Sequence, residues 1–305
     1  MRQMSPREKR AFFHSPLGFL REGRKQVAEA FLSGLAGGAR VSRLQSGRQI
    51  NLFVRRLEWD SGYFGYPVYR LDFADWDEDG ALSSEGLASA VTELRQELSD
   101  RHGRFYLFCE IPSEDLVMLQ AMGLAGMRCI ETRLTYFYDG VERFSWPSRF
   151  PVRQAGEADI PALRSVAIQA RNAFDRYHAD PFFSQSVADE YMATFVENSV
   201  RGFADAVMVP AEGEGAPGAF FTAVLKPAGE FPVDVKWGRI VLVAVGEERR
   251  GWHLRLMSEM SYFFRERGVE VAYMATQSTN RAVIRNCEKL GYRYGRASHV
   301  FASHA

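Results

Sequence analysis

A basic turn that follows a strongly apolar segment points most directly to chemistry in this sequence. Residues 240–245 read Ile-Val-Leu-Val-Ala-Val, and residues 246–251 read Gly-Glu-Glu-Arg-Arg-Gly. A helix predicted to begin near Arg250 would direct free N–H groups and the positive end of its dipole at this turn, and Arg249 and Arg250 add formal charge. Such a turn suits a pyrophosphate group. An ordinary strand-to-helix turn with solvated arginines is the alternative.

A second polar cluster lies in a loop predicted between two apolar helices. Within residues 175–180, Arg176 is suited to bind phosphate, and Tyr177 to stack or to form hydrogen bonds. His178 and Asp180 are candidate general bases, with His178 as the first choice. Together these residues predict a substrate site. The alternative is a connecting loop in which Asp180 and Arg176 cap the neighbouring helices.

Short strands and helices must position both clusters. In the first α/β region, the patterns predict strands at 51–57, 69–73, 105–111 and 131–138, and helices at 84–99 and from Pro112-Ser113 to the Gly123 region. Ser113 is the expected N-cap of the second helix. The segment 144–150 has neither period and marks a domain boundary.

The second region is predicted to contain ten elements in the order β-α-α-β-β-β-α-β-α-β. The strands are expected at 151–154, 206–210, 219–225, 238–245, 269–276 and 292–301, and the helices at 159–172, 184–198, 250–267 and 280–290. This order is more specific than any one element. No internal repeat is evident from residue identity.

Composition bounds the class of protein. A chain of 305 residues with 38 Lys and Arg against 38 Asp and Glu predicts two domains and argues against general nucleic-acid binding. Cys109, Cys129 and Cys287 are widely spaced, and the histidines form no metal-binding pair, so we expect a reducing cytoplasm and no metal. No apolar stretch approaches the length of a membrane span.

The first 48 residues differ from the rest, because they hold ten Lys and Arg against three Glu. Their spacing predicts one or two basic amphipathic helices, followed by a linker at Gly34–Gly38. We expect domains at 1–48 (basic helical extension), 49–145 (smaller N-terminal α/β domain) and 150–305. The extension could bind an anionic membrane or a protein partner, or pack on its own domain or on a second copy in a homodimer.

The second region resembles the Gcn5-related N-acetyltransferases (GNAT). The resemblance lies in residues 240–251, in Thr276-Gln277, and in the segment from Asn280 to Glu288-Lys289-Leu290-Gly291-Tyr292. It implies a GNAT fold of class α/β (α+β), with a central mixed twisted sheet flanked by helices, and acetyl-CoA as acyl donor. The cofactor site implied by the family comprises Val243, Val245, Arg249, Arg250, Gly251, Trp252, His253, Arg255 and Asn280.

Three residues depart from the family pattern. His253 and Arg255 stand where the family has small residues, and a side chain there can block a phosphate from the backbone. The two side chains could instead donate to the phosphate. Cys287 stands where many members have a proton-donating Tyr, so it is either a catalytic acid or a small apolar core residue.

Residues 174–181 and 57–65 also resemble segments of the dTDP-fucosamine acetyltransferase subgroup, over about residues 50–305. This resemblance implies direct transfer of an acetyl group to the amine of a nucleotide-linked amino sugar. Backbone N–H groups near Val243–Val245 would stabilise the oxyanion where strands separate. A GNAT that acts on another small amine or a peptide, and a catalytically silent scaffold of the same fold, are the alternatives.

Overall fold

Two α/β units make up the structure, a computed structural model that describes residues 4–76, 83–211, 215–227 and 234–305. Of these residues, unit 1 comprises those up to Arg133 and Arg296–Ala305, and unit 2 comprises those from Leu134 to Gly295. Strands β5 (Arg128–Asp139) and β11 (Arg293–His304) therefore contribute to both units. The division differs from the predicted one, because residues 1–48 belong to unit 1 and the boundary falls inside β5.

Unit 1 contains a mixed sheet in the strand order β1-β2-β3-β4-β11. Its other elements are α1 (Pro6–His14), α2 (Arg24–Gly34), a 3₁₀ turn (Leu35–Gly37), β1 (Ala39–Gln45), β2 (Arg48–Arg56), α3 (Glu58–Phe64), β3 (Val68–Trp76), α4 (Ser84–His102), β4 (Tyr106–Pro112) and α5 (Leu116–Leu124). Strand β3 is parallel to β4, and the other pairs are antiparallel. Strand β1 and helix α3 were not predicted from the sequence.

Local sequence explains the helix starts in unit 1. The Ser5 hydroxyl accepts a hydrogen bond from the Glu8 N–H, and the Glu8 carboxylate accepts one from the Ser5 N–H at 2.7 Å, so a capping box begins α1. Helix α5 is capped by Asp115, whose carboxylate accepts from the Met118 N–H at 3.1 Å. The prediction of Ser113 as this cap was wrong by two residues.

Unit 2 has the strand order β5-β10-β9-β8-β7-β6. Its elements are β6 (Val152–Gln154), α6 (Ile160–Gln169), α7 (Arg176–Ala179), α8 (Gln185–Asn198), β7 (Ala206–Pro210), β8 (Ala219–Lys226), β9 (Trp237–Val245), α9 (Trp252–Glu266), β10 (Val271–Gln277) and α10 (Arg281–Lys289), with short 3₁₀ or π turns at Val141–Arg143, Glu157–Asp159, Ser199–Phe203 and Glu247–Arg249. The predicted order of ten elements is confirmed, with the four-residue α7 added in the loop.

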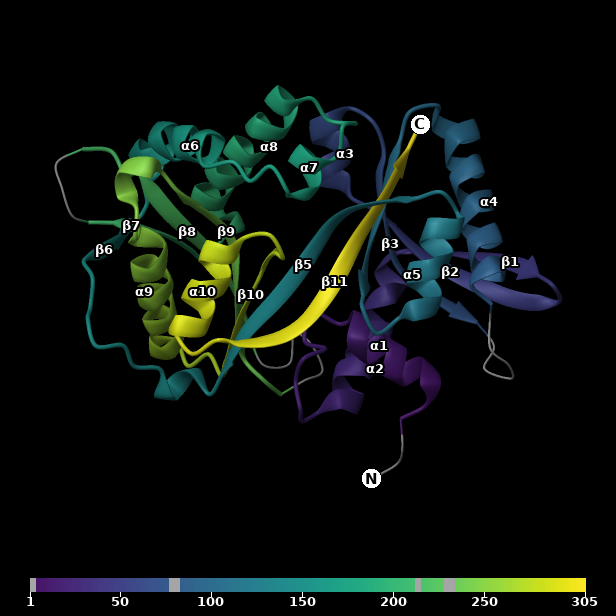
Figure 1. The fold of residues 1–305 in the computed structure, drawn as a ribbon, viewed down its shortest axis with the longest axis horizontal. Helices are drawn as coiled ribbons and strands as arrows, with labels where there is room; N and C mark the ends of the chain where they lie inside the picture. The colour runs from purple at the N-terminus through teal and green to yellow at the C-terminus, as the bar shows by residue number, and fades with distance from the viewer. Residues whose placement is uncertain (1–3, 77–82, 212–214, 228–233) are drawn as a thin grey trace. The chain divides into compact units, whose positions relative to one another are not determined.

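The helices of unit 2 cover both faces of its strands (Figure 1). Helices α9 and α10 pack with Phe221, Ile240 and other apolar residues on one face. Helices α6 and α8 pack with Phe220 and Ala244 on the other. Adjacent residues of β8 thus face opposite cores, as strand geometry requires. The predicted class, a mixed sheet flanked by helices, is confirmed.

Candidate functional site

Strands β9 and β10 separate within unit 2. They pair in parallel from Trp237 to Ile240 and from Val271 to Met274, and the pairing then ends although β9 continues to Val245 and β10 to Gln277. A gap between the carboxyl ends of two parallel strands is a common place for a ligand in sheets flanked by helices. Val243 and Val245, which the family resemblance implies as cofactor residues, lie on the part of β9 that does not pair with β10.

A β-bulge in β9 accompanies this separation. Ala223 pairs with Ile240 but Phe221 pairs with Val243, so two residues of β9 lie opposite Thr222. The Thr222 hydroxyl accepts from the Leu242 N–H at 2.9 Å and donates to the Leu242 carbonyl at 3.3 Å. Because of the bulge, Val243 and Val245 face the α9 and α10 side, as Ile240 does, while Leu242 and Ala244 face α6 and α8.

The turn that joins β9 to α9 presents the start of α9 to solvent. The Gly246 N–H donates to the Gly218 carbonyl at 2.8 Å and holds the end of β9 to β8. Gly251 has φ of 88°, a left-handed conformation that favours glycine, and no side chain caps α9. The first N–H groups of α9 and its dipole therefore favour an anion, beside an exposed Arg250 and a half-buried Arg249.

His253, in the first turn of α9, supplies an independent sign of a ligand. Its Nδ1 accepts a hydrogen bond from the Asn286 Nδ2 at 3.0 Å, which assigns the ring proton to Nε2. That Nε2 is buried and has no hydrogen-bond partner in the described part of the chain. Burial lowers the pKa of His253 to about 4, so the ring is a neutral donor at physiological pH. A buried donor without a protein partner is a candidate contact for a water molecule or a ligand group.

Two other residues of this turn do not have the predicted role. The Trp252 side chain is buried in the core between the sheet and α9. The Arg255 guanidinium lies 5.2 Å from the ring centres of both Phe150 and Trp252. The prediction that both side chains contact the cofactor is therefore not what the structure shows: both pack against neighbouring aromatic rings.

Cys287 and Asn280 lie on α10. Cys287 is buried, its Sγ is 3.6 Å from the Met274 Sδ, and burial raises its pKa to about 12. A thiol so placed is a poor acid, and the structure supports the core alternative and contradicts a catalytic one. The Asn280 side chain caps α10 by accepting from the Val283 N–H at 3.3 Å, at the end of α10 that follows β10.

The loop that carries His178 is internally bonded. His178 Nδ1 lies 2.7 Å from the Asp175 carboxylate and Nε2 lies 3.1 Å from that of Asp189. Burial lowers its pKa, but the two carboxylates raise it further, to above the ordinary value. Both ring nitrogens are bonded to carboxylates, so neither is left to accept a proton from a substrate. These contacts argue against the predicted role of His178 as a general base.

The remaining residues of this loop are also packed. Asp180 is completely buried and accepts from the Phe182 N–H at 3.1 Å, as a turn residue does. Arg176 donates to the Tyr177 hydroxyl, which donates to the Tyr191 hydroxyl at 2.8 Å. The predicted base Asp180 and the predicted substrate ligands Arg176 and Tyr177 therefore form bonds within the loop. Asp175 and Ser184 cap the neighbouring helices, which the alternative interpretation had assigned to Asp180 and Arg176.

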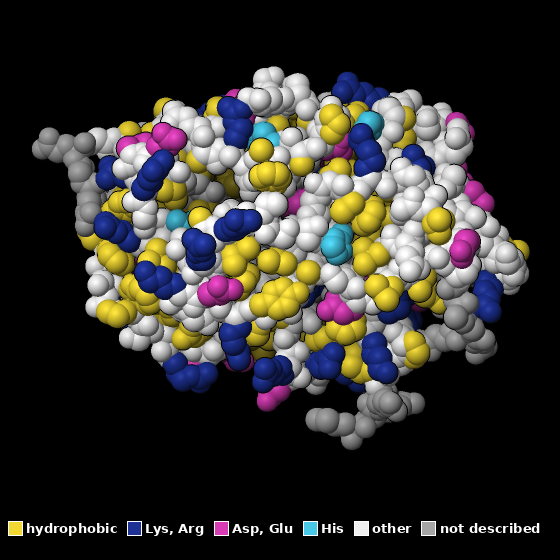
Figure 2. Space-filling view, viewed as in Figure 1, with side chains coloured by type: hydrophobic (Ala, Val, Ile, Leu, Met, Phe, Trp, Pro, Cys, Tyr) yellow, Lys and Arg dark blue, Asp and Glu magenta, His cyan; other side chains and the backbone are white. Residues whose placement is uncertain are grey.

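One residue of this region does reach the end of β10, and the sequence did not reveal it. The Asn172 amide donates to the Gln277 side chain at 2.5 Å. Asn172 lies between α6 and Asp175, so the bonded His178 loop holds it near the separated strands. Figure 2 shows the surface of unit 2 hollowed between α6 and α8 on one side and α9 and α10 on the other, with Lys and Arg side chains close to its edge. Neither Asn172 nor Asn286 stands in a motif that marks it.

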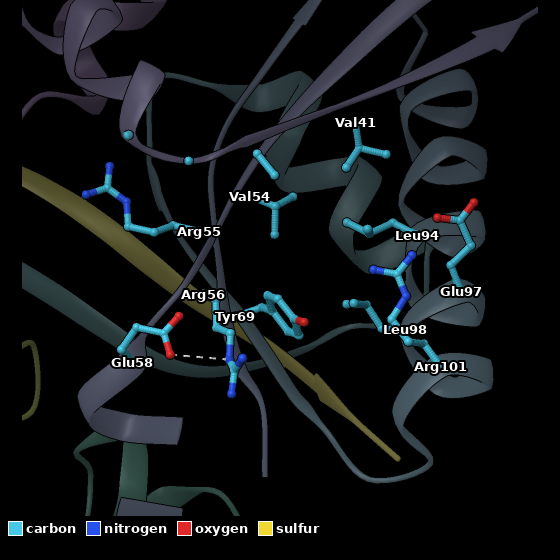
Figure 3. A pocket seen from close by; sticks show the side chains of 13 residues that line it. Val41, Val54, Arg55, Arg56, Glu58, Tyr69, Leu94, Glu97, Leu98 and Arg101 are labelled. Atoms are coloured by element: carbon cyan, nitrogen blue, oxygen red, sulfur yellow. Dashed lines mark ion pairs between the residues drawn. The ribbon is translucent and has the colours of Figure 1, made fainter. Parts of the chain in front are cut away.

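Unit 1 has a separate cavity of about 410 Å³, between the β1–β2 ribbon and α4 (Figure 3). Its lining is mixed, with apolar side chains such as Val54, Leu94 and Leu98 beside three arginines and two glutamates. Arg56 pairs with Glu58 at 3.6 Å and Arg55 with Asp72 at 3.1 Å, so only part of the positive charge is available to a ligand. This cavity shares no residue with the separated strands of unit 2.

Within residues 4–76, 83–211, 215–227 and 234–305, no group of His, Cys, Asp or Glu could hold a metal ion. None of the helices described is both long and apolar enough to cross a membrane.

No protein-family model matches this sequence, and no curated protein matches it. Solved structures do. A GCN5-related N-acetyltransferase from Sphaerobacter thermophilus is 14% identical, with a TM-score of 0.53 over 84% of this chain and 76% of that one. A tandem GNAT protein from the clavulanic acid biosynthesis pathway, solved without AcCoA, is 15% identical, with a TM-score of 0.50 over 84% and 78%.

A third similar structure contains the GCN5-related glucosamine N-acetyltransferase region of a fungal multi-domain GH3 β-N-acetylglucosaminidase. It is 12% identical, with a TM-score of 0.55 over 90% of this chain and 34% of that one. At these identities the likeness concerns the fold. The chain has the fold of the GCN5-related N-acetyltransferases.

Proposed function

We propose that unit 2 transfers an acyl group from acyl-CoA to an amine. The observation that carries this proposal is the combination of two features at one place: strands that separate after a bulge, and an uncapped basic helix start with the buried, unpartnered His253 Nε2. The first suits a narrow acyl-bearing arm, and the second suits a pyrophosphate.

The residues present fit acyl-CoA. The N–H groups at the start of α9, with Arg249 and Arg250, would hold the pyrophosphate, and His253 adds one neutral donor. Asn280 stands at the facing end of α10. The expected obstacle, a side chain in a glycine position, is absent for Arg255, whose side chain turns away to Phe150 and Trp252.

Acyl-CoA supplies a thioester whose carbonyl carbon is open to attack by an amine. The contribution of the chain is to orient the two reactants at the separated ends of β9 and β10. Backbone N–H groups of β9 near Val243–Val245 stabilise negative charge on the carbonyl oxygen. No covalent intermediate with the protein is required.

The proton of the amine passes to water in this account. His178 and Asp180 are bonded and buried, so neither receives it. His178 acts instead as a positioning group, because its two carboxylate bonds fix the loop that places Asn172 against Gln277. The leaving thiolate is protonated by solvent, since Cys287 faces Met274 in the core.

The acceptor class is an amine, and a nucleotide-linked amino sugar is the first candidate. Two short segments of the sequence resemble the amino-sugar nucleotide subgroup, and one structure of similar fold is a glucosamine N-acetyltransferase region. The packed state of Arg176 and Tyr177 removes two residues that would have recognised the nucleotide. The acceptor assay therefore needs a panel.

The test is acetyl transfer measured by mass spectrometry with the full chain and acetyl-CoA. The panel contains amino-sugar nucleotides, free amino sugars, amino acids, an aminoglycoside and a peptide with a free N-terminus. We expect one class to be acetylated, and Arg249→Ala/Arg250→Ala to lower the rate at limiting acetyl-CoA. Arg101→Ala, at the rim of the unit 1 cavity, is the matched control and leaves the rate unchanged. Binding of acetyl-CoA without transfer to any amine would contradict the enzyme and favour a scaffold.

A further inference from the structure

Unit 1 repeats the arrangement of strands found around the separated strands of unit 2. Strand β3 is parallel to β4 only from Val68–Arg70 to Tyr106–Phe108, after which both continue unpaired with one another to Trp76 and Pro112. The antiparallel register of β2 with β3 shifts between Phe53 and Val54, which places a bulge at Asp72. Unit 2 shows the same bulge and separation in β8, β9 and β10.

At this bulge the alternation of side chains between the two faces of the sheet is shifted in β3, as it is in β9. Leu71 and Ala74 both pack in the core with α4 and α5, although they are three residues apart. Phe73 faces the opposite side and contacts His14, with ring centres 5.1 Å apart. In β9, Ile240 and Val243 are likewise three residues apart and share one face.

The helices also correspond in order. Helices α1 and α2 precede β1 and β2 as α6 and α8 precede β7 and β8, and α4 and α5 follow β3 and β4 as α9 and α10 follow β9 and β10. Asp115 caps α5 three residues beyond the end of β4, and Asn280 caps α10 three residues beyond the end of β10. The basic segment predicted as an extension is therefore the first helix pair of a repeated unit.

Side chains of α1 bridge the separated strands of unit 1. The Arg10 guanidinium lies 3.7 Å from the centre of the Trp76 ring, on the unpaired part of β3, and donates to the Asp115 carboxylate at 2.8 Å and 3.1 Å. His14 lies 2.9 Å from the same carboxylate oxygen. The side chains of His14 and Asp115 are 1% and 2% exposed, so this contact is closed to solvent.

We infer that unit 1 is a second unit of the same fold whose opening between strands is filled by Arg10 and His14, so that the chain has one acyl-CoA site, in unit 2. The inference rests on the proposed function of unit 2.

Calorimetric titration of the full chain with acetyl-CoA tests the inference. We expect one equivalent to bind, and its affinity to fall in Arg249→Ala/Arg250→Ala with no second equivalent remaining. Two equivalents, one of them unaffected by these substitutions, would overturn the inference.

Thermal unfolding tests the closure itself, without any ligand. In the cycle of Arg10→Ala, Asp115→Asn and the double variant, we expect Arg10→Ala to lower the Tm strongly in the wild-type chain and only slightly beside Asp115→Asn. Additive shifts would overturn the closure. A further outcome is strong coupling between the Arg10 and Asp115 substitutions in a chain that binds no acetyl-CoA. This result would refute the proposed function of unit 2 but would support the closure of unit 1. If a variant fails to fold, Arg10→Lys, which keeps the charge but loses the forked contact, provides the same comparison.

Discussion

Asp115 and Asn280 occupy the same position in two copies of one arrangement, yet they have different neighbours. Each caps the helix that follows a separated strand. Asp115 is a buried carboxylate bonded to Arg10 and His14, whereas Asn280 is half-exposed and neutral. Strand separation and a bulge alone therefore do not make a ligand site, because the side chains between the strands decide whether the opening is filled.

The arginines of α1 in unit 1 and the arginines before α9 in unit 2 show the same contrast. In unit 1, Arg7 pairs with Asp75 at 2.7 Å and Arg10 with Asp115, so basic residues of α1 are used within the unit. In unit 2, Arg250 is exposed at an uncapped helix start. One set of arginines stabilises the fold, and the other is available to an anion.

The largest expected difference is in the free energy of unfolding that is lost in Asp115→Ala and in Asn280→Ala. Asp115→Ala leaves Arg10 and the first turn of α5 without their partner, and breaking such a buried pair costs about 3–5 kcal/mol of unfolding free energy. Asn280→Ala removes a helix cap and costs about 1 kcal/mol. Urea unfolding measures both. Equal losses would contradict the different roles of the two caps.

His253→Phe is expected to weaken acetyl-CoA binding by about 10- to 100-fold. It removes a donor to a charged ligand, and such a bond contributes about 1.5–3 kcal/mol. Calorimetry measures the loss. Arg255→Ala is the matched control two residues further along α9. It removes a stacked side chain, so it lowers the Tm and leaves the affinity within about threefold, a change worth less than 1 kcal/mol. A large loss of affinity in Arg255→Ala and little loss in His253→Phe would show that Arg255, and not His253, contacts the phosphate.

Two histidines, His14 in unit 1 and His178 in unit 2, predict opposite pH dependence. Burial lowers the pKa of His14, an effect larger than the opposing bond to Asp115. The unfolded chain then binds more protons than unit 1 does, so the stability of unit 1 falls as the pH drops below about 6.5. The pKa of His178 is raised, so its stabilisation is complete below about 6.5 and is lost as the pH rises through the higher folded value.

NMR titration of the imidazole protons measures both histidines in the folded chain, with His14→Gln and His178→Gln to assign the signals. Each unit of pKa difference corresponds to about 1.4 kcal/mol. A His178 signal that titrates below its ordinary pKa would contradict the cationic bonds to Asp175 and Asp189, and would restore His178 as a candidate base.

The smallest expected effect is that of Cys287→Ala on turnover. Because the thiol is buried with a pKa of about 12, we expect kcat to change by less than about twofold, or 0.4 kcal/mol in barrier. The Tm falls slightly, because a buried sulfur is lost from the core. A large fall in kcat with an unchanged Tm would return Cys287 to the mechanism.

The sequence predicted the fold better than the site. Apolar periodicity and the turn residues predicted the ten elements of unit 2 in order, because these signals are local. The turn at Arg249–Gly251 was located for the same reason. The bulges and the strand separation depend on pairing between distant segments, and no local pattern in β9 or β3 marks them. The repeat escaped notice because it is kept in strand pairing and not in residue identity.

The errors at individual residues have a common cause. His178, Asp180 and Cys287 are residue types that can do chemistry, but their partners come from elsewhere in the chain: Asp189 for His178, and Met274 for Cys287. Arg255 was expected at phosphate, and Phe150 binds it in a stacked contact instead. Residue type predicts what a side chain can do, while burial and partners decide what it does.

Hydrogen–deuterium exchange of the full chain with and without acetyl-CoA tests the central claim most directly, because it reports on both units in one sample. We expect slower exchange in peptides that cover 241–255 and 276–283, and no change in those that cover 71–76 and 106–118. Protection of the unit 1 peptides, or no protection in either unit at saturating acetyl-CoA, would contradict it.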